Sequence, residues 1–532
     1  MTKFILTILD TGGIQDYIFG SNKLQLNLAA SYLVDAATRA WVKESLDAIE
    51  VKHNLDNVKG FDTEQPFLPG LEIESSAIDA EVILAGGGNT QILFRDLATA
   101  KRFAQKLSRK VLDQSTGLKI TIIHEKFDWE KDMLGGEPGV IDRTMKRLAQ
   151  RKMQSNTSPP ILGLGVTAQD IYTGLPVVSM HEGLGVSAEI KAKYNVVDDA
   201  NRRLASLLNM SHGYQFAWQF EDMGQKEGES NYIAVVHADG NGMGNRVRAV
   251  GRGASDNRDY VTKMRAFSLS IREAALTTLQ ETVDKLVEII EDEGIREKIK
   301  MNGRFLPFRP IVFGGDDITF VAEGRLGLSL TSFYLKKFSE KIYADNKSAY
   351  ARAGVAVVKS HFPFARAYKL AESLASSAKR RIKEVSQDGE AAAMDWHFAS
   401  LGPIFSLNEI REREYTAANG ESLLMRPVLL SASNDWRTWE NMVALVEEFS
   451  ENDNWRERHN KVMRLRSALR QGPQAVEHFR KVYNVGLLPP IAELGEDVRE
   501  KGWEKGYCGY FDAIETKDFF IPFKRTQEVQ HA

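Results

Sequence analysis

The spacing of apolar residues changes several times along the first 130 residues. Short apolar runs typical of strands lie at residues 4–9, 82–84, 91–94 and 118–124. Between them, apolar residues recur at helical spacing over 22–46 and 97–112. The order of strand, helix, hairpin, helix and strand is typical of a ferredoxin-like unit, the architecture of a palm domain. We therefore predict a first palm domain at residues 1–127.

The same order of elements recurs later in the chain. The predicted elements are a strand at 232–238, a helix at 260–291, a hairpin at 311–321, a helix at 328–344, a strand at 351–358 and a helix at 364–384. The two hairpin turns are also alike, with Gly-Gly-Gly-Asn at 86–89 and Gly-Gly-Asp-Asp at 314–317. We infer an internal duplication and place a second palm domain at 229–400. Two unrelated α/β units are the alternative.

The remaining segments are predicted to be largely helical. Helical patterns occupy residues 127–156 and 200–209 in a linker subdomain at 128–228, and most of 435–485 in a C-terminal domain at 401–532. The predicted fold class is therefore α+β: two ferredoxin-like palm domains, a helical linker region and a mostly helical C-terminal domain.

The turn of the second hairpin carries adjacent carboxylates, Asp316 and Asp317, after Gly314 and Gly315. Two carboxylates side by side repel each other, and a divalent cation is the simplest way to neutralise them. The glycines lack side chains, so a nucleotide could approach the backbone there. An ordinary surface turn is the alternative for this pattern taken alone.

A second acidic motif strengthens the metal-site hypothesis. The strand at 232–238 ends at Asp239, and Gly240, Gly242 and Gly244 follow. If this strand pairs with the hairpin, three carboxylates meet around Mg²⁺ or Mn²⁺, the arrangement used for phosphoryl transfer. The first hairpin has Gly88 and Asn89 at the matching positions, so we predict that the first palm binds no catalytic metal.

Composition narrows the class of protein. The 532 residues are 43% hydrophobic and 27% charged with a formal net charge of −3, which argues against a general nucleic-acid-coating protein. One cysteine, Cys508, excludes a disulfide framework. With no signal-peptide pattern and no apolar stretch of membrane-spanning length, we expect a cytoplasmic protein without membrane contact. The chain contains neither a His-Asp dipeptide nor a P-loop motif.

The motifs together resemble those of a known family. The motifs of the second unit are the segment 239–244, the hairpin at 313–318, and the segment 361–364 with Glu372 and Lys379. The motifs of the first unit are the segments 14–19, 23–24 and 30–33 and the turn at 86–89. This combination resembles the large palm-domain subunit of type III CRISPR effector complexes. The likeness covers both palms and the linker, up to about residue 400.

The resemblance implies an enzyme that joins ATP molecules into cyclic oligoadenylates, second messengers of antiviral defence. Asp239, Asp316 and Asp317 would hold Mg²⁺, and Lys379 matches a lysine that contacts the triphosphate in the related GGDEF cyclases. One ATP would lie at each palm, with Ser31 and Tyr32 as candidate contacts in the first. Other effector subunits and guide or target RNA are the implied partners, and a homodimer is also considered.

Three features depart from the family pattern. The His-Asp nuclease domain of many members is missing, so we expect a short form without DNA cleavage. Cysteines usual near residues 173–176 are absent, which argues against the family's structural zinc. Asn241 stands where an aspartate is frequent.

Two other functions stay open at this point. One is a non-catalytic scaffold subunit of an RNA-guided complex. The other is a GGDEF-type cyclase that uses GTP, because contacts to the base cannot be read from sequence spacing.

Overall fold

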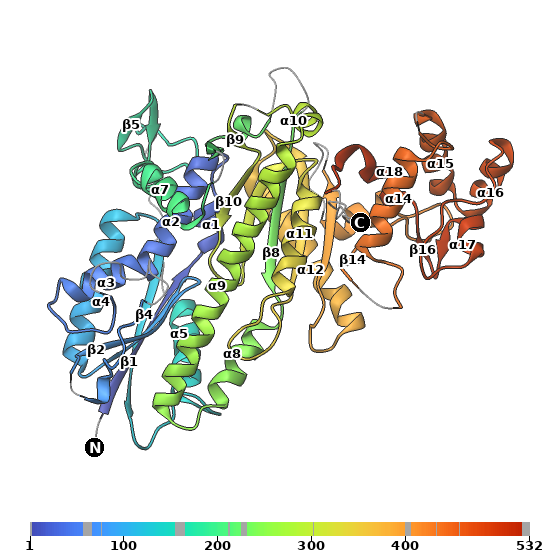
Figure 1. Cartoon of the computed structure of the whole chain (residues 1–532). Helices are drawn as coiled ribbons and strands as arrows, with labels where there is room; N and C mark the ends of the chain where they lie inside the picture. Colours follow the sequence, from blue (N-terminus) through green and yellow to red (C-terminus); the bar gives the residue numbers. More distant parts are fainter. Residues whose placement is uncertain are drawn as a thin grey trace, which may run out of the picture.

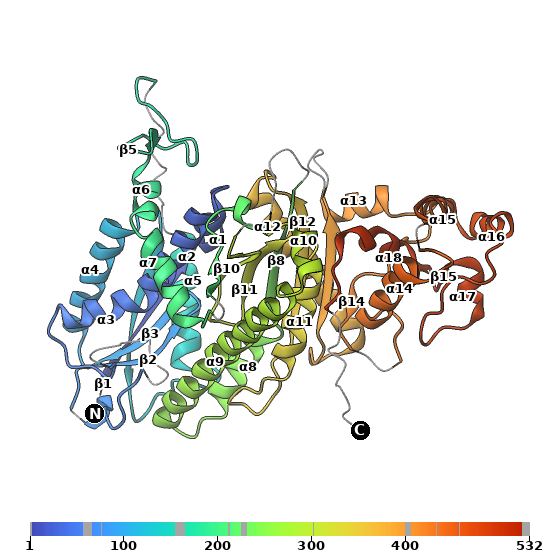
Figure 2. The ribbon, with the colours of Figure 1, turned by 45° about the horizontal axis from the view of Figure 1, so that its top comes forward.

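The computed structural model describes residues 3–56, 66–75, 77–154, 165–210, 213–224, 231–301, 303–399, 406–431, 434–456 and 458–523. The molecule is elongated, with a small sheet near the N-terminus at one end, the last helices at the other, and a larger sheet between them (Figures 1 and 2). Within the described ranges, no helix combines the length and the apolar character needed to cross a bilayer.

A four-stranded antiparallel sheet, the first sheet, is built from the first quarter of the chain in the order β2-β3-β1-β4. Its strands are β1 (Lys3–Gly12), β2 (Ala80–Gly86), β3 (Asn89–Phe94) and β4 (Lys119–Asp128). The accompanying helices are α1 (Ile14–Phe19), α2 (Leu24–Thr38), α3 (Ala40–Asp47) and α4 (Leu97–Gln114). Along β1, Ile5 and Leu9 belong to one apolar cluster and Phe4 and Leu6 to another, so both faces of this sheet are covered.

A six-stranded sheet, the second sheet, has the order β10-β11-β8-β12-β13-β14. Its strands are β8 (Tyr232–Gly240), β10 (Phe308–Val312), β11 (Ile318–Glu323), β12 (Ala351–Lys359), β13 (Ala393–Phe398) and β14 (Val428–Leu429). The helices between them are α8 (Met243–Arg252), α9 (Asn257–Ile290), α10 (Glu293–Ile299), α11 (Gly327–Ser339) and α12 (Phe364–Val385). Only β12 and β13 pair in parallel, because α12 forms the crossover between them.

The two sheets share a common arrangement. In each, a hairpin (β2-β3 or β10-β11) pairs through its second strand with the first strand of the unit (β1 or β8), whose other edge pairs with β4 or β12. The backbone at the two turns corresponds as well: the Thr11 amide donates to Gly88 at 2.9 Å, and the Gly240 amide donates to Asp316 at 3.1 Å. Asp10 in the first sheet therefore takes the position of Asp239 in the second.

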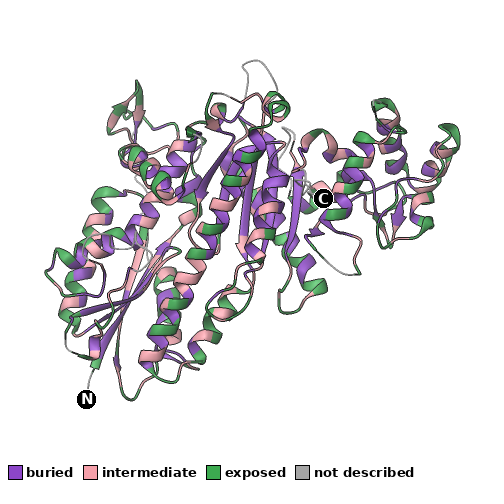
Figure 3. Ribbon diagram, in the orientation of Figure 1, coloured by how far each residue is buried: buried purple, intermediate pink, exposed green. Residues whose placement is uncertain are grey.

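The second sheet is covered on both faces. On β8, Ile233 and Val235 join the cluster that continues into the first sheet, whereas Ala234 and Val236 join the cluster shared with the C-terminal helices. Figure 3 shows these central strands as almost wholly buried. Burial on both faces explains why residues 232–238 form a continuous apolar run rather than an alternating one.

The rest of the chain forms smaller elements. Along the chain, the strands of the first sheet are followed by α5 (Val140–Gln154), a projecting hairpin of β5 (Ser179–His181) and β6 (Leu184–Val186), α6 (Ala188–Tyr194), α7 (Val197–Leu207) and β7 (Gln215–Phe216). Strand β7 pairs with β9 (Phe305–Leu306), which comes after β8 in the sequence. After residue 406 come α13 (Leu407–Glu414), α14 (Trp439–Glu451), α15 (His459–Gln471), α16 (Pro473–Val482), α17 (Glu496–Lys501), the hairpin β15 (Trp503–Glu504) and β16 (Tyr507–Cys508), and α18 (Phe511–Thr516).

The structure differs from the sequence-based expectations in several places. The helix predicted at 22–46 is interrupted at Arg39, which has φ −130° and ψ −81°. The helix predicted at 127–156 begins only at Val140, because β4 continues to Asp128 and a segment containing three glycines and a proline follows. Helix α8 and strand β13 were not predicted, since two glycines weaken the helical pattern of α8 and β13 is short.

The predicted domain boundaries stay predictions. Two of them, at 228/229 and 400/401, lie outside the described residues. The boundary at 127/128 falls at the end of β4.

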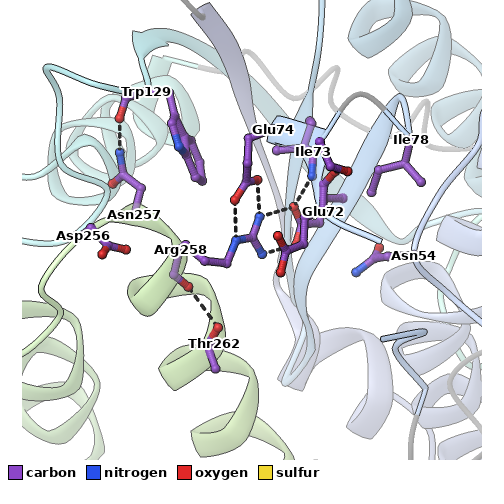
Figure 4. Close-up of polar contacts among 12 residues, drawn as sticks. Asn54, Glu72, Ile73, Glu74, Ile78, Trp129, Asp256, Asn257, Arg258 and Thr262 are labelled. Atoms are coloured by element: carbon purple, nitrogen blue, oxygen red, sulfur yellow. Dashed lines mark hydrogen bonds and ion pairs between the residues drawn. The ribbon is translucent and has the colours of Figure 1, made fainter. Parts of the chain in front are cut away.

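A buried ion cluster fixes α9 to the first sheet (Figure 4). Glu81 on β2 is completely buried, and Arg258 donates to both of its carboxylate oxygens at 2.7 and 2.8 Å. Arg265, two turns further along α9, donates to Glu81 at 2.6 Å, and Arg258 also contacts Glu74 at 2.7 Å. Because a buried carboxylate is costly without partners, this cluster specifies how α9 lies against β2.

Replacing Glu81 by Gln is expected to lower the free energy of unfolding by about 3 kcal/mol, since it leaves two guanidinium groups with one carboxylate fewer. Glu74→Gln is the matched control, because the Glu74 side chain is 28% exposed and the expected cost is below about 1 kcal/mol. Chemical unfolding of both variants measures the difference. Equal midpoints for Glu81→Gln and the wild type would contradict the role of the cluster.

Gly354→Ala is expected to destabilise the fold by about 1–3 kcal/mol through overpacking. A Cβ atom at Gly354 would lie 2.0 Å from the Ala371 carbonyl oxygen, so α12 would have to move away from β12. Gly486→Ala is the control, because its Cβ would meet no atom within 4 Å. Thermal unfolding compares the two, and an unchanged melting temperature for Gly354→Ala would show that the contact is not tight.

Candidate active site

Three carboxylates from two distant segments converge at the second hairpin. Asp239 at the end of β8 and Asp316 and Asp317 in the β10–β11 turn offer carboxylate oxygens that all lie within 4.8 Å of one another. Desolvation and the neighbouring Asp317 raise the pKa of Asp316, and desolvation and Glu372 raise the pKa of Asp317. Holding all three charges together is therefore unfavourable unless a cation is bound.

Strand pairing explains why these residues meet. β11 pairs antiparallel with β8, with Ile318 opposite Ala238, so the turn before β11 lies beside the end of β8. Gly240 permits the close approach, because a Cβ there would lie 2.9 Å from the Asp316 Cβ. Gly314 adopts φ +93°, a conformation that favours glycine. The acidic cluster therefore depends on the register in which β11 pairs with β8.

Arg352 is a site residue that sequence reasoning missed. It lies on β12 directly opposite Asp239 and forms an ion pair with its Oδ2 atom. The same guanidinium donates to the Gly240 carbonyl at 3.0 Å and to the Asn241 Oδ1 at 3.2 Å. The sequence held one signal for this residue, an arginine among the apolar residues of a predicted buried strand.

Asn241 is oriented by bonds that an aspartate could not make. Its Nδ2 donates to the carbonyl oxygens of Gly389 at 3.1 Å and Ala391 at 2.8 Å. This side chain therefore anchors the segment before β13, and its amide oxygen accepts from Arg352.

A cavity of about 310 Å³ lies between the turns of the two hairpins. Asp316 and Asp317 line it from the second sheet, and Gly87 and Gly88 line it from the first. Helix α2, the break after it and helix α9 supply further walls. Their lining residues are Ser31, Val34, Asp35, Thr38, Arg39, Ser268, Leu269, Ile271 and Arg272.

The predicted nucleotide-binding residues divide into two groups. Ser31, Gly314 and Gly315 line the cavity. Gly240, Gly242 and Gly244 do not line it. Gly240 is the last residue of β8, Gly242 is the N-terminal cap of α8 with φ +67°, and Gly244 lies in the first turn of α8.

Lys379 and Tyr32 are likewise not part of the cavity wall. Lys379 is exposed on α12, and the nearby Arg352 and desolvation lower its pKa. Tyr32 is half-buried and packs against the apolar cluster shared by the two sheets.

A contact between the two units lies beside the acidic cluster. The Gln15 Nε2 on α1 donates to the Glu372 Oε1 on α12 at 3.0 Å, across 357 residues of sequence. Glu372 is also the carboxylate whose charge raises the pKa of Asp317. Stacking of Phe19 on Tyr368, with ring centroids 3.9 Å apart, supports the same interface.

The chemistry of the cluster suits a hard divalent cation. Asp239, Asp316 and Asp317 offer only oxygen ligands, which Mg²⁺ and Mn²⁺ prefer. His237 is buried, lies 3.3 Å from the Thr319 hydroxyl, and has a pKa lowered to about 4 by burial and Arg352, so it is a packed strand residue.

The fold and the site together define a mixed α+β protein with several sheets and an acidic cluster at a cavity between two of them. No model of a known protein family matches the chain, and no curated protein matches it. Its structural neighbours are Csm1 chains, the large palm-domain subunit of type III CRISPR-Csm complexes.

Three solved structures illustrate the likeness. Csm1 from T. onnurineus has a TM-score of 0.56 and 14% identity, with 99% of this chain and 70% of that chain covered. The Csm1–Csm4 cassette in complex with cA3 gives 0.55 and 14%, covering 98% and 70%. The cassette in complex with AMPPNP gives 0.53 and 15%, covering 97% and 70%. At this identity the likeness establishes the fold alone, and at that level it confirms the resemblance found in the sequence.

Binding of Mn²⁺ is expected to require the acidic cluster. Titration followed by electron paramagnetic resonance should show at least one bound Mn²⁺ in the wild type, and Asp316→Ala with Asp317→Ala should abolish it because two of three oxygen donors are lost. Asp10→Ala is the matched control, since Asp10 takes the corresponding place in the first sheet and forms an ion pair with Lys152. Equal Mn²⁺ binding by the double variant would contradict the site.

Proposed function

We propose that the chain is a nucleotidyltransferase that converts ATP into cyclic oligoadenylates. The single observation that carries the proposal is the convergence of Asp239, Asp316 and Asp317 at a cavity between two glycine-rich turns. Solved neighbours of the same fold hold cA3 or AMPPNP, which supports adenine nucleotides as the substrate class.

The proposed reaction is transfer of a nucleotidyl group. The 3′-oxygen of one nucleotide forms a bond to the α-phosphorus of an ATP, the bond from that phosphorus to the β-phosphate oxygen breaks, and pyrophosphate and a proton leave. When bound by the three aspartates, Mg²⁺ or Mn²⁺ supplies Lewis-acid stabilisation of the charge on the reacting oxygens. A repeat of the same transfer within one chain closes the ring.

The residues around the cluster have separate roles in this proposal. Arg352 fixes the orientation of the Asp239 carboxylate through its ion pair. Gly314 and Gly315 leave the backbone of the turn open to the nucleotide. Lys379, exposed on α12, contributes a cationic point charge near the triphosphate.

In this proposal the two halves of the cavity bind different nucleotides. The metal-binding half takes the nucleotide whose α-phosphorus is attacked, and the half formed by the first sheet takes the nucleotide that supplies the 3′-hydroxyl. Ser31 lies in this second half.

Incubation with labelled ATP and Mg²⁺ tests the proposal, with and without candidate subunits and target RNA. Pyrophosphate and oligoadenylates are the expected products. Asp316→Ala with Asp317→Ala is expected to reduce the rate at least a hundredfold, as for loss of central transition-state contacts (about 10²–10³ each). The control is Asp198→Ala with Asp199→Ala, an adjacent pair at the start of α7. Unchanged activity of the variant with Asp316→Ala and Asp317→Ala would contradict the proposal.

The same assay distinguishes two other functions. Turnover of GTP but not ATP would assign a GGDEF-type cyclase. Absence of turnover with any nucleotide, together with co-purification of small RNA and other subunits, would assign a scaffold subunit; the scaffold reading draws support from neighbours solved as Csm1–Csm4 cassettes.

A further inference from the structure

The two edges of the first sheet differ. At β2 the edge is closed, because the Asn54 Nδ2 donates to the Val82 carbonyl at 3.0 Å and the Asn54 Oδ1 accepts from the Val82 amide at 2.8 Å. The Ala80 amide also donates to the Lys52 carbonyl at 3.1 Å. At β4, in the part of the chain that the structure describes, residues 119–127 form backbone hydrogen bonds with β1 alone. Alternate N–H and C=O groups of β4 therefore point away from the sheet without a partner among the described residues.

We propose that the free edge of β4 binds an extended, acidic segment of a partner protein, which joins the first sheet as an additional strand. In strand addition of this kind, main-chain hydrogen bonds supply affinity and the flanking side chains supply selectivity. The binding surface consists of β4 with the neighbouring helices α4 and α5. Binding there requires none of the residues of the acidic cluster, so it goes beyond the nucleotide chemistry.

An open groove of about 540 Å³ lies beside this edge, lined by Ile123 of β4 and by Arg147, Gln150, Arg151 and Gln154 of α5. The four α5 residues recur at intervals of three and four, so they share one face of the helix. Ile123 is 5% exposed and belongs to an apolar cluster that also contains buried residues of α5, which holds the helix against the strand. The groove therefore offers an apolar floor, amide groups and guanidinium groups next to the unpaired backbone.

The surroundings of the edge carry cations without partners. Within the described residues, neither an ion pair nor a side-chain hydrogen bond is formed by Lys101 of α4, Lys119 and Lys126 of β4, or Arg151 of α5. Desolvation, Lys101 and Arg151 lower the pKa of His124 on β4, so both helices bring a cation close to this strand. The unpaired backbone groups thus lie among positive charges.

The strand itself does not neutralise these cations. Glu125 is the one acidic residue in 119–127, and it already forms ion pairs with Arg147 and, at 3.5 Å, with Arg143. An acidic segment is therefore complementary to the edge, because its carboxylates would meet cations that lack an opposite charge.

The same features disfavour two other occupants. A second copy of this chain would bring identical rows of cations together, and lysines at a free edge oppose such self-pairing. The phosphates of a nucleic acid could accept from the free N–H groups of β4 but would also meet its free carbonyl oxygens. A polypeptide strand uses both kinds of group.

A synthetic peptide of about eight residues in which glutamate alternates with valine is the probe. Fluorescence anisotropy of the labelled peptide with the full chain should show saturable binding that weakens as salt rises. Hydrogen–deuterium exchange followed by mass spectrometry should show slower exchange in residues 119–128 and no change in residues 80–86, whose edge is already closed. A peptide with lysine in place of glutamate is the control and should bind at least about tenfold more weakly.

Methylated peptides separate strand addition from charge attraction. Methylation of one alternate set of backbone nitrogens in the glutamate peptide should abolish binding, because those N–H groups face β4. Methylation of the other set should leave binding in place, since those groups face away.

The variant with Lys101→Glu and Arg151→Glu should bind the glutamate peptide about tenfold more weakly, as expected when two exposed ion pairs become repulsions. It should bind the lysine peptide more tightly. Arg109→Glu with Arg202→Glu is the matched control, because these side chains are 76% and 75% exposed on α4 and α7. Should the first variant fail to fold, the methylated peptides still test the surface in the unaltered chain.

Four results would overturn the proposal. Two are an absence of binding by the glutamate peptide and equal binding of the glutamate and lysine peptides. A third is binding that leaves exchange in residues 119–128 unchanged. The fourth is protection of the same residues by another occupant: by raising the protein concentration without peptide, which would assign the edge to a second copy, or by a single-stranded oligonucleotide that the glutamate peptide does not displace.

Discussion

The pairing of β11 with β8 is the constraint on which the site depends. It places a turn with two carboxylates beside a strand that ends in a third, although 77 residues separate Asp239 from Asp316 in sequence. The apolar residues of β8 and β11 pack on both faces of the sheet, and this burial offsets the repulsion among the charges at its edge. Arg352, from the strand on the other side of β8, supplies the nearest compensating charge.

The cavity depends on how the two sheets are fixed to each other. Its walls come from both hairpin turns, from α2 and from α9, so a small shift of α9 would change its shape. Three kinds of contact oppose such a shift: the ion cluster around Glu81, the stacking of Phe19 on Tyr368, and an apolar cluster shared by both sheets. Since protein interiors are close-packed, these contacts hold one arrangement of the walls.

The two units keep one backbone plan but differ in charge. Both turns make the same backbone hydrogen bond to the first strand of their unit, and both first strands lead into a helix capped by a glycine with φ near +66°, Gly13 or Gly242. In the second unit the turn is acidic, whereas in the first unit Asp10, at the matching position of the strand, forms an ion pair with Lys152.

Most of the elements and the acidic residues could be predicted from the amino-acid sequence, because each depends on local patterns. Apolar periodicity located β1, α4, β8, the second hairpin and α12 closely, and the acidic turn stood out among glycines. Which distant groups meet depends on the tertiary structure. The pairing of Arg352 with Asp239 and the contact of Gln15 with Glu372 join residues 113 and 357 positions apart, and no local pattern encodes such contacts.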